Sequence, residues 1–364
     1  MLAVITIALI VVQEMCARLG AMTGMGLSEL VREHFGVRVT TFIVLSLLIA
    51  NVGTSFSEFV GVGAAAELLH VPKYAAIPVA AALLWGLVVF GSYRSVERVF
   101  LTMALVFLAY PLTALFADPN WHDVGRGVIV PSVPKSAGGI QMVIALIGTT
   151  ITPYMQLYLA SSVAEKAIRR DDYMYEQVDV VAGSIFSNSI SATMIIATAA
   201  TLYVAGISVG TADEAARALE PIAGAGASYL FAVGLLGACL LAAPVLALTS
   251  AYSVAEAIGV EKGVSQDFRR APVFMGIFTG TIVISAAAAL VPGIPFTSTL
   301  ITIQVVDALV LPVVIYALLR LTNDRELMGD QANSVAFNVI AVTTGGVVVL
   351  LSTILVVLTV GEIL

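Results

Sequence analysis

The chain has 364 residues, of which 59% are hydrophobic and only 11% are charged, and its mean hydropathy is +1.01. Soluble domains are roughly 45–50% apolar and about 25% charged, so this composition excludes a water-soluble globular protein. The net charge of −7 includes no long run of like charges, which argues against nucleic acid as a partner. We therefore expect an all-α polytopic membrane protein.

Ten apolar segments follow one another along the chain. A helix rises about 1.5 Å per residue and the hydrocarbon core is about 30 Å thick, so most of these segments can cross a bilayer. They lie at 2–17, 39–69, 74–92, 99–117, 138–161, 177–205, 226–255, 271–291, 297–319 and 334–361. The pattern predicts ten transmembrane helices.

If every segment crosses, successive loops alternate sides, and the basic residues divide unevenly between the two sides. Of the 17 Lys and Arg residues, only Lys73, Arg126, Lys135 and Arg217 fall on one side. The excess of positive charge marks the other side as cytoplasmic, and we expect a multi-pass protein of the cell membrane, the inner membrane in a prokaryote. The same alternation puts the start of the first segment outside, which predicts a further span ahead of it.

Polar side chains form a stripe inside the second segment. Asn51, Ser55 and Glu58 recur at spacings of four and three, so they share one helix face. Ionisable groups within spans are costly and mark functional sites by default, which favours a functional role for Glu58. For Asn51, and for Asn188 in the sixth segment, a hydrogen bond between helices is the simpler interpretation, with cation ligation as the alternative.

The fifth segment has the most unusual sequence, with Pro153 in mid-membrane after Thr149, Thr150 and Thr152. Proline donates no N–H, and its ring displaces the carbonyl one turn earlier, at Thr149, from regular helical bonding. A freed carbonyl at this depth is tolerated where it lines a cavity or finds a partner. Two interpretations follow: a broken helix whose carbonyls bind an ion, or a proline kink bridged by threonine hydroxyls.

The ninth segment carries Gln304 and Asp307, three residues apart and on one face, followed by Pro312. A carboxylate in this setting is expected to face the protein interior and not lipid. The sequence contains no H-E-x-x-H pair, which argues against an intramembrane zinc protease, and no other catalytic pair is recognisable. We expect no enzymatic activity.

Three motifs resemble those of the Nramp family of divalent metal transporters: R-L-G-A-M-T-G at 18–24, T-S-F-S-E-F-V-G at 54–61 and T-N-D-R-E-L-M-G at 322–329. Segment order and spacing agree from the family's second span to its eleventh. The resemblance implies one transmembrane transporter domain over 1–364 with a leucine-transporter-type inverted-repeat fold that lacks the family's first span. It also implies a divalent metal ion as substrate, a surrounding of membrane lipid, no cofactor and no obligate protein partner.

The departures from the family pattern are as informative as the matches. The family's D-P-G-N motif, which supplies an aspartate and an asparagine to the metal, does not occur here. Where the family has A-T-V-M-P-H, this chain replaces the methionine by Thr152 and the histidine by Tyr154. A thioether favours transition metals and a hydroxyl favours hard cations, so the exchange resembles the Nramp-related magnesium transporters. We expect the cation environment to comprise the following residues, the first through its carbonyl: Thr149, Thr152, Tyr154, Gln304 and Asp307.

The family's proton path is reduced in this chain. Ser55 stands where the family has an aspartate, and Ala160 stands at its second histidine position, although Glu58 remains. We therefore expect transport of Mg²⁺ and also of Mn²⁺ with weak or no proton coupling, and Ser55, Glu58 and Asn188 as candidates for the pathway or for coupling. Two alternatives stay open: a proton-coupled Mn²⁺/Fe²⁺ transporter of the ordinary Nramp type, and a sodium-coupled amino-acid transporter of the same fold.

Overall fold

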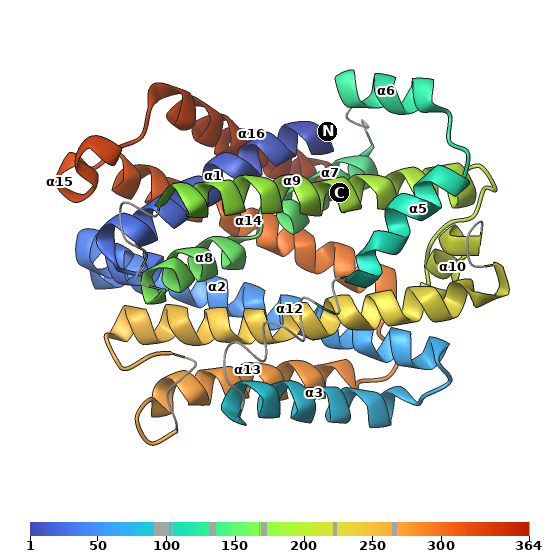
Figure 1. Ribbon diagram of the computed structural model, residues 1–364, viewed down its shortest axis with the longest axis horizontal. Coiled ribbons are helices and arrows are strands. Elements are labelled where there is room, and N and C mark those ends of the chain that lie inside the picture. Colours follow the sequence, from blue (N-terminus) through green and yellow to red (C-terminus); the bar gives the residue numbers. More distant parts are fainter. Residues whose placement is uncertain are drawn as a thin grey trace.

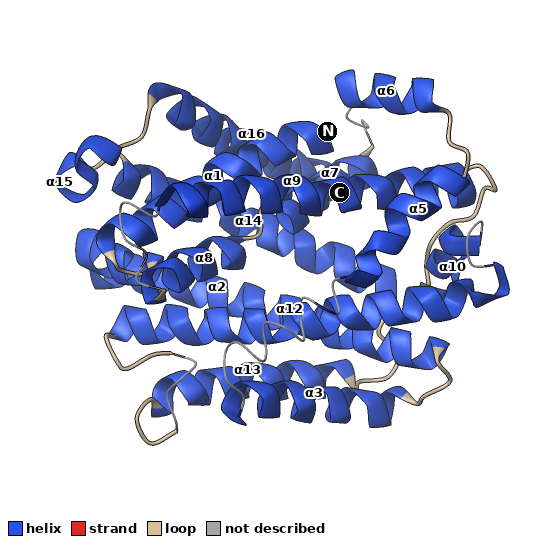
Figure 2. Cartoon of the chain, in the orientation of Figure 1, coloured by secondary structure: helices blue, strands red, loops and turns tan. Residues whose placement is uncertain are grey.

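Every regular element that the structure describes is a helix, as the composition predicts (Figure 2). The structure is a computed structural model, and it describes residues 1–90, 102, 105–130, 136–166, 168, 173–220, 224–263 and 268–363. Within these ranges nine helices, counting α7 with α8 as one, are long and apolar enough to cross a membrane. The predicted segment at 99–117 lies partly outside the described residues, and only its later part is seen, as η1 (Leu105–Leu108) and α5 (Ala109–Phe116).

The other predicted segments correspond to long helices. Their bounds are α1 Leu2–Thr23, α2 Leu27–Leu68, α3 Lys73–Phe90, α7 Ala137–Thr150, α8 Pro153–Glu165, α9 Tyr173–Thr198, α12 Ala227–Ile258, α13 Pro272–Ala289, α14 Phe296–Thr322 and α16 Val335–Ile363. Short elements connect them: α6 Trp121–Ile129, the π-helix η3 Ala199–Tyr203, α10 Ala212–Ala216, η4 Arg217–Leu219, η5 Gly224–Gly226, α15 Arg325–Met328 and η6 Gly329–Gln331.

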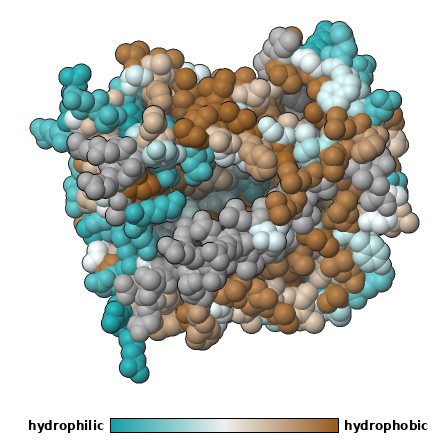
Figure 3. Space-filling model, in the orientation of Figure 1, coloured by the Kyte–Doolittle hydropathy of each residue, from teal (hydrophilic) through white to brown (hydrophobic). Residues whose placement is uncertain are grey.

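The long helices lie side by side with their ends gathered at two faces. The ends of α8 and α12, the start of α13 and all of α15 lie at the left in Figure 1, and α10 lies at the right. Hydrophobic residues dominate the middle of the molecule in Figure 3, whereas hydrophilic residues gather toward the two ends. This arrangement is that of a multi-pass membrane protein, and the left end is the one that the basic residues mark as cytoplasmic.

Helix α2 is central to the fold. It has a short first part at 27–35 and a long second part at 37–68, because Gly36 adopts φ 77°, a backbone conformation that favours glycine. Its first half joins a cluster of buried apolar residues from α1, α7, α8, α14 and α16. Its later half joins a second cluster from α3, α12 and α13. The polar stripe predicted at 51–58 therefore lies between two apolar packing regions.

Charged residues tie α2 to α12 at the cytoplasmic end. The Lys262 ammonium lies 3.0 Å from a carboxylate oxygen of Glu256 and 3.1 Å from one of Glu29. Burial alone would lower the pKa of Lys262, but the carboxylates of Glu256 and Glu29 raise it, so the side chain stays charged. The Glu256 side chain is only 1% exposed, and Lys262 is the cation that compensates its charge.

Replacing Lys262 by methionine should destabilise the protein by about 3 kcal/mol, because a buried carboxylate would be left without its cation. The measurement is the thermal unfolding midpoint in detergent. Arg217→Met is the matched control, since its pair with Asp213 is 3.9 Å long and about half exposed and should be worth about 0.5 kcal/mol or less. Adding Glu256→Gln to Lys262→Met should recover most of the loss; failure to recover would contradict the assignment.

Candidate functional site

The fifth predicted segment is a broken helix and not a kinked one. Helix α7 ends at Thr150 and α8 begins at Pro153. Between them Ile151 (φ −115°, ψ 65°) and Thr152 (φ −71°, ψ 137°) leave the helical conformation. Because Pro153 has no N–H, the Thr149 carbonyl has no helical donor four residues further on. Of the two interpretations of this segment, the interruption of the helix is the one observed.

The end of α7 lies directly against α14. A Cβ atom on Gly148 would lie 2.0 Å from the backbone carbonyl oxygen of Gln304 and 3.0 Å from the backbone nitrogen of Ala308. The two helices approach this closely because residue 148 has no side chain. The contact brings the turn that carries Thr149 next to the turn that carries Gln304.

Asp307 faces the protein interior, as predicted, and is 1% exposed. Its Oδ2 accepts a hydrogen bond from the Thr54 hydroxyl of α2 at 2.8 Å, and its Oδ1 is buried without a partner. The same Thr54 hydroxyl lies 3.0 Å from the Ala50 carbonyl. A hydroxyl has one hydrogen, so it donates to only one of these acceptors at a time. The sequence pattern did not identify Thr54, because threonine commonly bonds to its own helix.

Four buried oxygen atoms of the helix break, of α14 and of α2 have no hydrogen-bond partner. They are Thr152 Oγ1, Gln304 Oε1, Asp307 Oδ1 and Ser55 Oγ. Leaving such a group unpaired costs about 1–3 kcal/mol, so each one calls for an explanation. Buried oxygen atoms that lack a hydrogen-bond donor are groups that a hard cation could satisfy.

Tyr154 links these groups in space. It interacts with the Thr152 hydroxyl, although without the geometry of a regular hydrogen bond, and it lies within electrostatic range of both Glu58 and Asp307. The structure thus brings α7, α8, α14 and α2 together around one region. Among the described residues no group of three His, Cys, Asp or Glu side chains could hold a metal ion. The available ligands here are hydroxyl, amide, carbonyl and isolated carboxylate oxygens.

The remaining candidates lie on neighbouring helices. Glu58 interacts with the Cys239 thiol of α12, and Asn51 donates to the Ser250 hydroxyl at 3.1 Å. Asn188 donates to the Thr6 hydroxyl of α1 at 2.9 Å. For Asn51 and Asn188 the hydrogen bond between helices, the simpler of the two predictions, is therefore observed.

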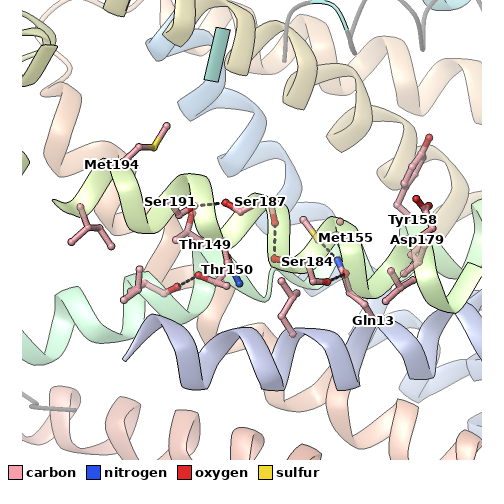
Figure 4. Close-up of a pocket in the computed structure, with 17 residues that line it drawn as sticks. Gln13, Thr149, Thr150, Met155, Tyr158, Asp179, Ser184, Ser187, Ser191 and Met194 are labelled. Carbon is pink, nitrogen blue, oxygen red and sulfur yellow. Dashed lines mark hydrogen bonds between the residues drawn. The ribbon is translucent and has the colours of Figure 1, made fainter. Parts of the chain in front are cut away.

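A cavity of about 600 Å³ opens between α1, α7, α8 and α9 beside the helix break. Figure 4 shows Thr149 and Thr150 on one side and Ser184, Ser187 and Ser191 along α9 on the other. The Ser184 hydroxyl donates to Gln13 of α1 at 2.7 Å. These serines were not among the residues predicted from the sequence, although their spacing of three and four residues places them on one helix face.

Comparison with known proteins identifies related transporters. The family model for Nramp, described as natural resistance-associated macrophage protein-like, matches residues 1–358. The divalent metal cation transporter MntH of Burkholderia ambifaria is 28% identical over 350 residues, covering 93% of this chain and 76% of that protein. The protein of the same name from Caldanaerobacter subterraneus is 26% identical over 368 residues, covering 97% of this chain and 84% of that protein.

Solved structures share the fold. A crystal structure of a mutant manganese transporter from Eremococcus coleocola matches with a TM-score of 0.71 at 18% identity, covering 97% of this chain and 78% of that one. The same transporter in complex with an aromatic bis-isothiourea substituted compound matches with a TM-score of 0.71 at 20% identity. The likeness confirms the expected inverted-repeat fold of the leucine-transporter type.

Gly148→Ala should force α7 away from α14, because the added methyl would overlap the Gln304 carbonyl, and should cost about 1–3 kcal/mol or more. Thermal unfolding in detergent measures the loss. Gly138→Ala in the same helix is the control, since nothing lies within 4 Å of its added Cβ, and should cause no loss. Equal stability of the two variants would show that the close approach is absent.

Proposed function

The chain belongs to the Nramp family, and on that premise we propose that it carries divalent metal cations across the membrane, with Mg²⁺ as a preferred substrate and Mn²⁺ as a second. The single observation that carries the proposal is the broken helix at residues 151–152, beside which Thr152, Gln304 and Asp307 present buried oxygen atoms without partners. Thr149 through its carbonyl and Tyr154 through its hydroxyl complete the proposed environment. The site is assigned to the transported cation and not to a cofactor.

The donor chemistry supports a hard cation. The proposed ligands are all oxygen atoms, which Mg²⁺ and Mn²⁺ accept, and the thioether typical of the family is replaced by the Thr152 hydroxyl. The nearest methionine along the chain, Met155, accepts a hydrogen bond from Gln13 Nε2 at 2.7 Å through its sulfur. Its sulfur is therefore occupied by an amide in this conformation.

Weak or absent proton coupling forms the second part of the proposal. Ser55 carries no charge, and Ala160 offers no titratable group where the family has a histidine. The backbone at Ala160 also packs tightly on α1, since a Cβ on Gly20 would lie 2.5 Å from the Ala160 carbonyl oxygen. Two acidic residues remain near the proposed site. Glu58 interacts with the Cys239 thiol, and Asp307 accepts a hydrogen bond from the Thr54 hydroxyl.

The second candidate function is proton-coupled Mn²⁺ transport. The relatives support the manganese part of this candidate, because they are a divalent metal cation transporter and a manganese transporter. The two candidates differ in the ion ranking and in proton movement, and one experiment separates them.

Purified protein in liposomes should take up Mg²⁺ in the presence of excess Ca²⁺ without acidifying the lumen, since the proposed site has hard ligands and few groups that carry protons. Fluorescent indicators for Mg²⁺ and for lumenal pH measure both quantities. Mn²⁺ uptake with lumenal acidification and without Mg²⁺ uptake would replace the proposal by the second candidate. Na⁺-dependent uptake of an amino acid would reject both.

Thr152→Met should raise the preference for Mn²⁺ or Cd²⁺ over Mg²⁺ by roughly tenfold, which corresponds to about 1.4 kcal/mol of differential binding, because it restores a soft ligand. Competitive uptake in liposomes measures the ranking. Thr152→Leu is the control: it removes the hydroxyl and adds similar bulk without sulfur, so it should lower Mg²⁺ uptake without favouring Cd²⁺. An unchanged ranking in Thr152→Met would contradict the assigned role of this position.

A further inference from the structure

The cavity between α1, α7, α8 and α9 extends well beyond the proposed cation environment. Of the residues assigned to that environment, only Thr149 lines the cavity. The lining follows α9 from Asp179 to Ile195, a helical length of about 24 Å at 1.5 Å per residue. Figure 4 shows Asp179 at one end of the cavity and Met194 toward the other. The part of the cavity near Asp179 therefore has no role in the site described above.

Asp179 has the only charged side chain among the described residues that line the cavity. It is exposed and lies in the second turn of α9, at the cytoplasmic end of this helix. Its neighbour Glu176 interacts electrostatically both with Asp179, which repels it, and with Lys166, which attracts it. The charges of Glu176 and Lys166 offset each other, so this end of the cavity keeps one net negative charge. A charge of this sign raises the local concentration of cations.

Three hydroxyl groups of the lining act as hydrogen-bond acceptors toward the cavity. Ser187 donates its hydrogen to the Ser184 carbonyl at 3.3 Å, and Ser191 donates to the Ser187 carbonyl at 3.2 Å. On the other wall, Thr150 donates to the Leu146 carbonyl at 2.7 Å. A hydroxyl has one hydrogen and two lone pairs, so each oxygen can still accept a hydrogen bond.

Gly183 leaves space between Asp179 and Ser187. The three residues follow one another at spacings of four and therefore share one face of α9. A Cβ atom on Gly183 would have nothing within 4 Å. Water occupies about 30 Å³ per molecule, so the octahedral water shell of a cation needs about 180 Å³. The cavity of about 600 Å³ can hold such a hydrated ion without movement of a helix.

A hydrated divalent cation matches the chemistry of this stripe. Mg²⁺ gives up its water reluctantly, and the hydrogens of the bound water point away from the ion. The surroundings of the shell must therefore supply acceptors and negative charge. Among the residues that the structure describes, no three His, Cys, Asp or Glu side chains are grouped so as to hold a bare ion. Contact through water is the mode of binding that remains.

We propose that Asp179, Gly183 and Ser187 form an outer-sphere cation site, separate from the helix break, which holds a divalent cation through its intact water shell. Asp179 supplies the charge, Ser187 accepts a hydrogen bond from the bound water, and Gly183 provides the space. The cation rests here in hydrated form between the helix break and the cytoplasm. The inference rests on the proposed function for the identity of the cargo, but binding at this stripe can be measured without transport.

The probe is hexaamminecobalt(III), which does not exchange its ammine ligands and therefore binds only through its outer shell. The readout is a cysteine placed at Ser191, which lines the cavity beyond Ser187. A charged, membrane-impermeant methanethiosulfonate reagent is added to the cytoplasmic face in inside-out vesicles, and the bound complex should slow the labelling. The chain without the added cysteine gives the background, since Cys16 and Cys239 are 0% and 3% exposed.

Asp179→Asn should raise the concentration of complex that halves the labelling rate by about tenfold, because the attracting charge is lost. Asp179→Glu keeps the charge and should retain most of the protection. Glu33→Gln is the matched control: it removes an exposed carboxylate at the same end of the protein that does not line the cavity, and it should change nothing.

Gly183→Leu tests the space and not the charge. Its side chain should fill the seat of the ion and abolish the protection by the complex. The fold should tolerate the change, because nothing lies within 4 Å of the added Cβ and leucine favours a helix more than glycine does. Full protection in this variant would place the bound complex elsewhere and overturn the site.

Equal protection in Asp179→Asn and its parent would also overturn the site, as would an equal loss in Glu33→Gln. Failure to label the cysteine at 191 from the cytoplasmic face would do the same, because the cavity would then be closed on that side. Protection by Mg²⁺ but not by hexaamminecobalt(III) would indicate direct coordination and reject the outer-sphere mode.

The outcome is separable from that of the proposed function. If liposomes take up no divalent cation but protection still depends on Asp179, the proposed function fails and the outer-sphere site stands. If cation uptake is observed and the complex gives no protection, the site fails and the proposed function stands.

Discussion

The organising constraint of this structure is a backbone carbonyl that loses its partner inside a membrane. Pro153 has no N–H to offer the Thr149 carbonyl, and no bulk water is at hand in the hydrocarbon to replace it. Helix α7 therefore ends at Thr150, and a new helix, α8, begins at Pro153. Proline is well tolerated in the first turn of a helix, where its missing N–H leaves no hydrogen bond unmade. The two residues between the helices, Ile151 and Thr152, are both buried, and the Thr152 hydroxyl has no hydrogen-bond partner. Everything proposed for function begins at this interruption.

The helix break can form a cation site only because α14 and α2 lie close to it. Without a side chain at Gly148, α7 lies against the backbone of α14 at Gln304, and Asp307, one turn along, reaches Thr54 of α2. Apolar packing on both sides of the 51–58 stripe keeps α2 at this distance. Oxygen atoms of Thr152, Gln304 and Asp307 are buried here without hydrogen-bond donors. Such unpaired polar groups destabilise a folded protein unless a bound cation or another partner satisfies them. Membership of the Nramp family and the unpaired buried oxygen atoms both support the proposal that the protein carries divalent cations.

The two ends of α8 contact different parts of the protein. Its start carries Thr152 and Tyr154, and its end carries Glu165, which the Tyr252 hydroxyl holds. A rigid helix of 13 residues transmits a change at one end to the other, because its own hydrogen bonds resist bending. The contact that Tyr252 makes with Glu165 and the positions of Thr152 and Tyr154 are therefore connected through a single helix.

The sequence by itself determined the class of the protein, the course of most of its spans and the position at which the fifth segment departs from a regular helix, whereas the structure decided that this departure is a break and not a kink. Hydropathy and the missing N–H of Pro153 are local properties, which a reader of the chain can evaluate without knowing the neighbours of a residue. The Nramp motifs likewise lie within short stretches. Only the tertiary structure decided that Asp307 is held by Thr54, that Gly148 permits contact with α14, and that Tyr252 reaches Glu165. Each of these pairs joins residues far apart along the chain, and a hydroxyl that could equally bond to its own helix carries no signal of the distant partner it meets.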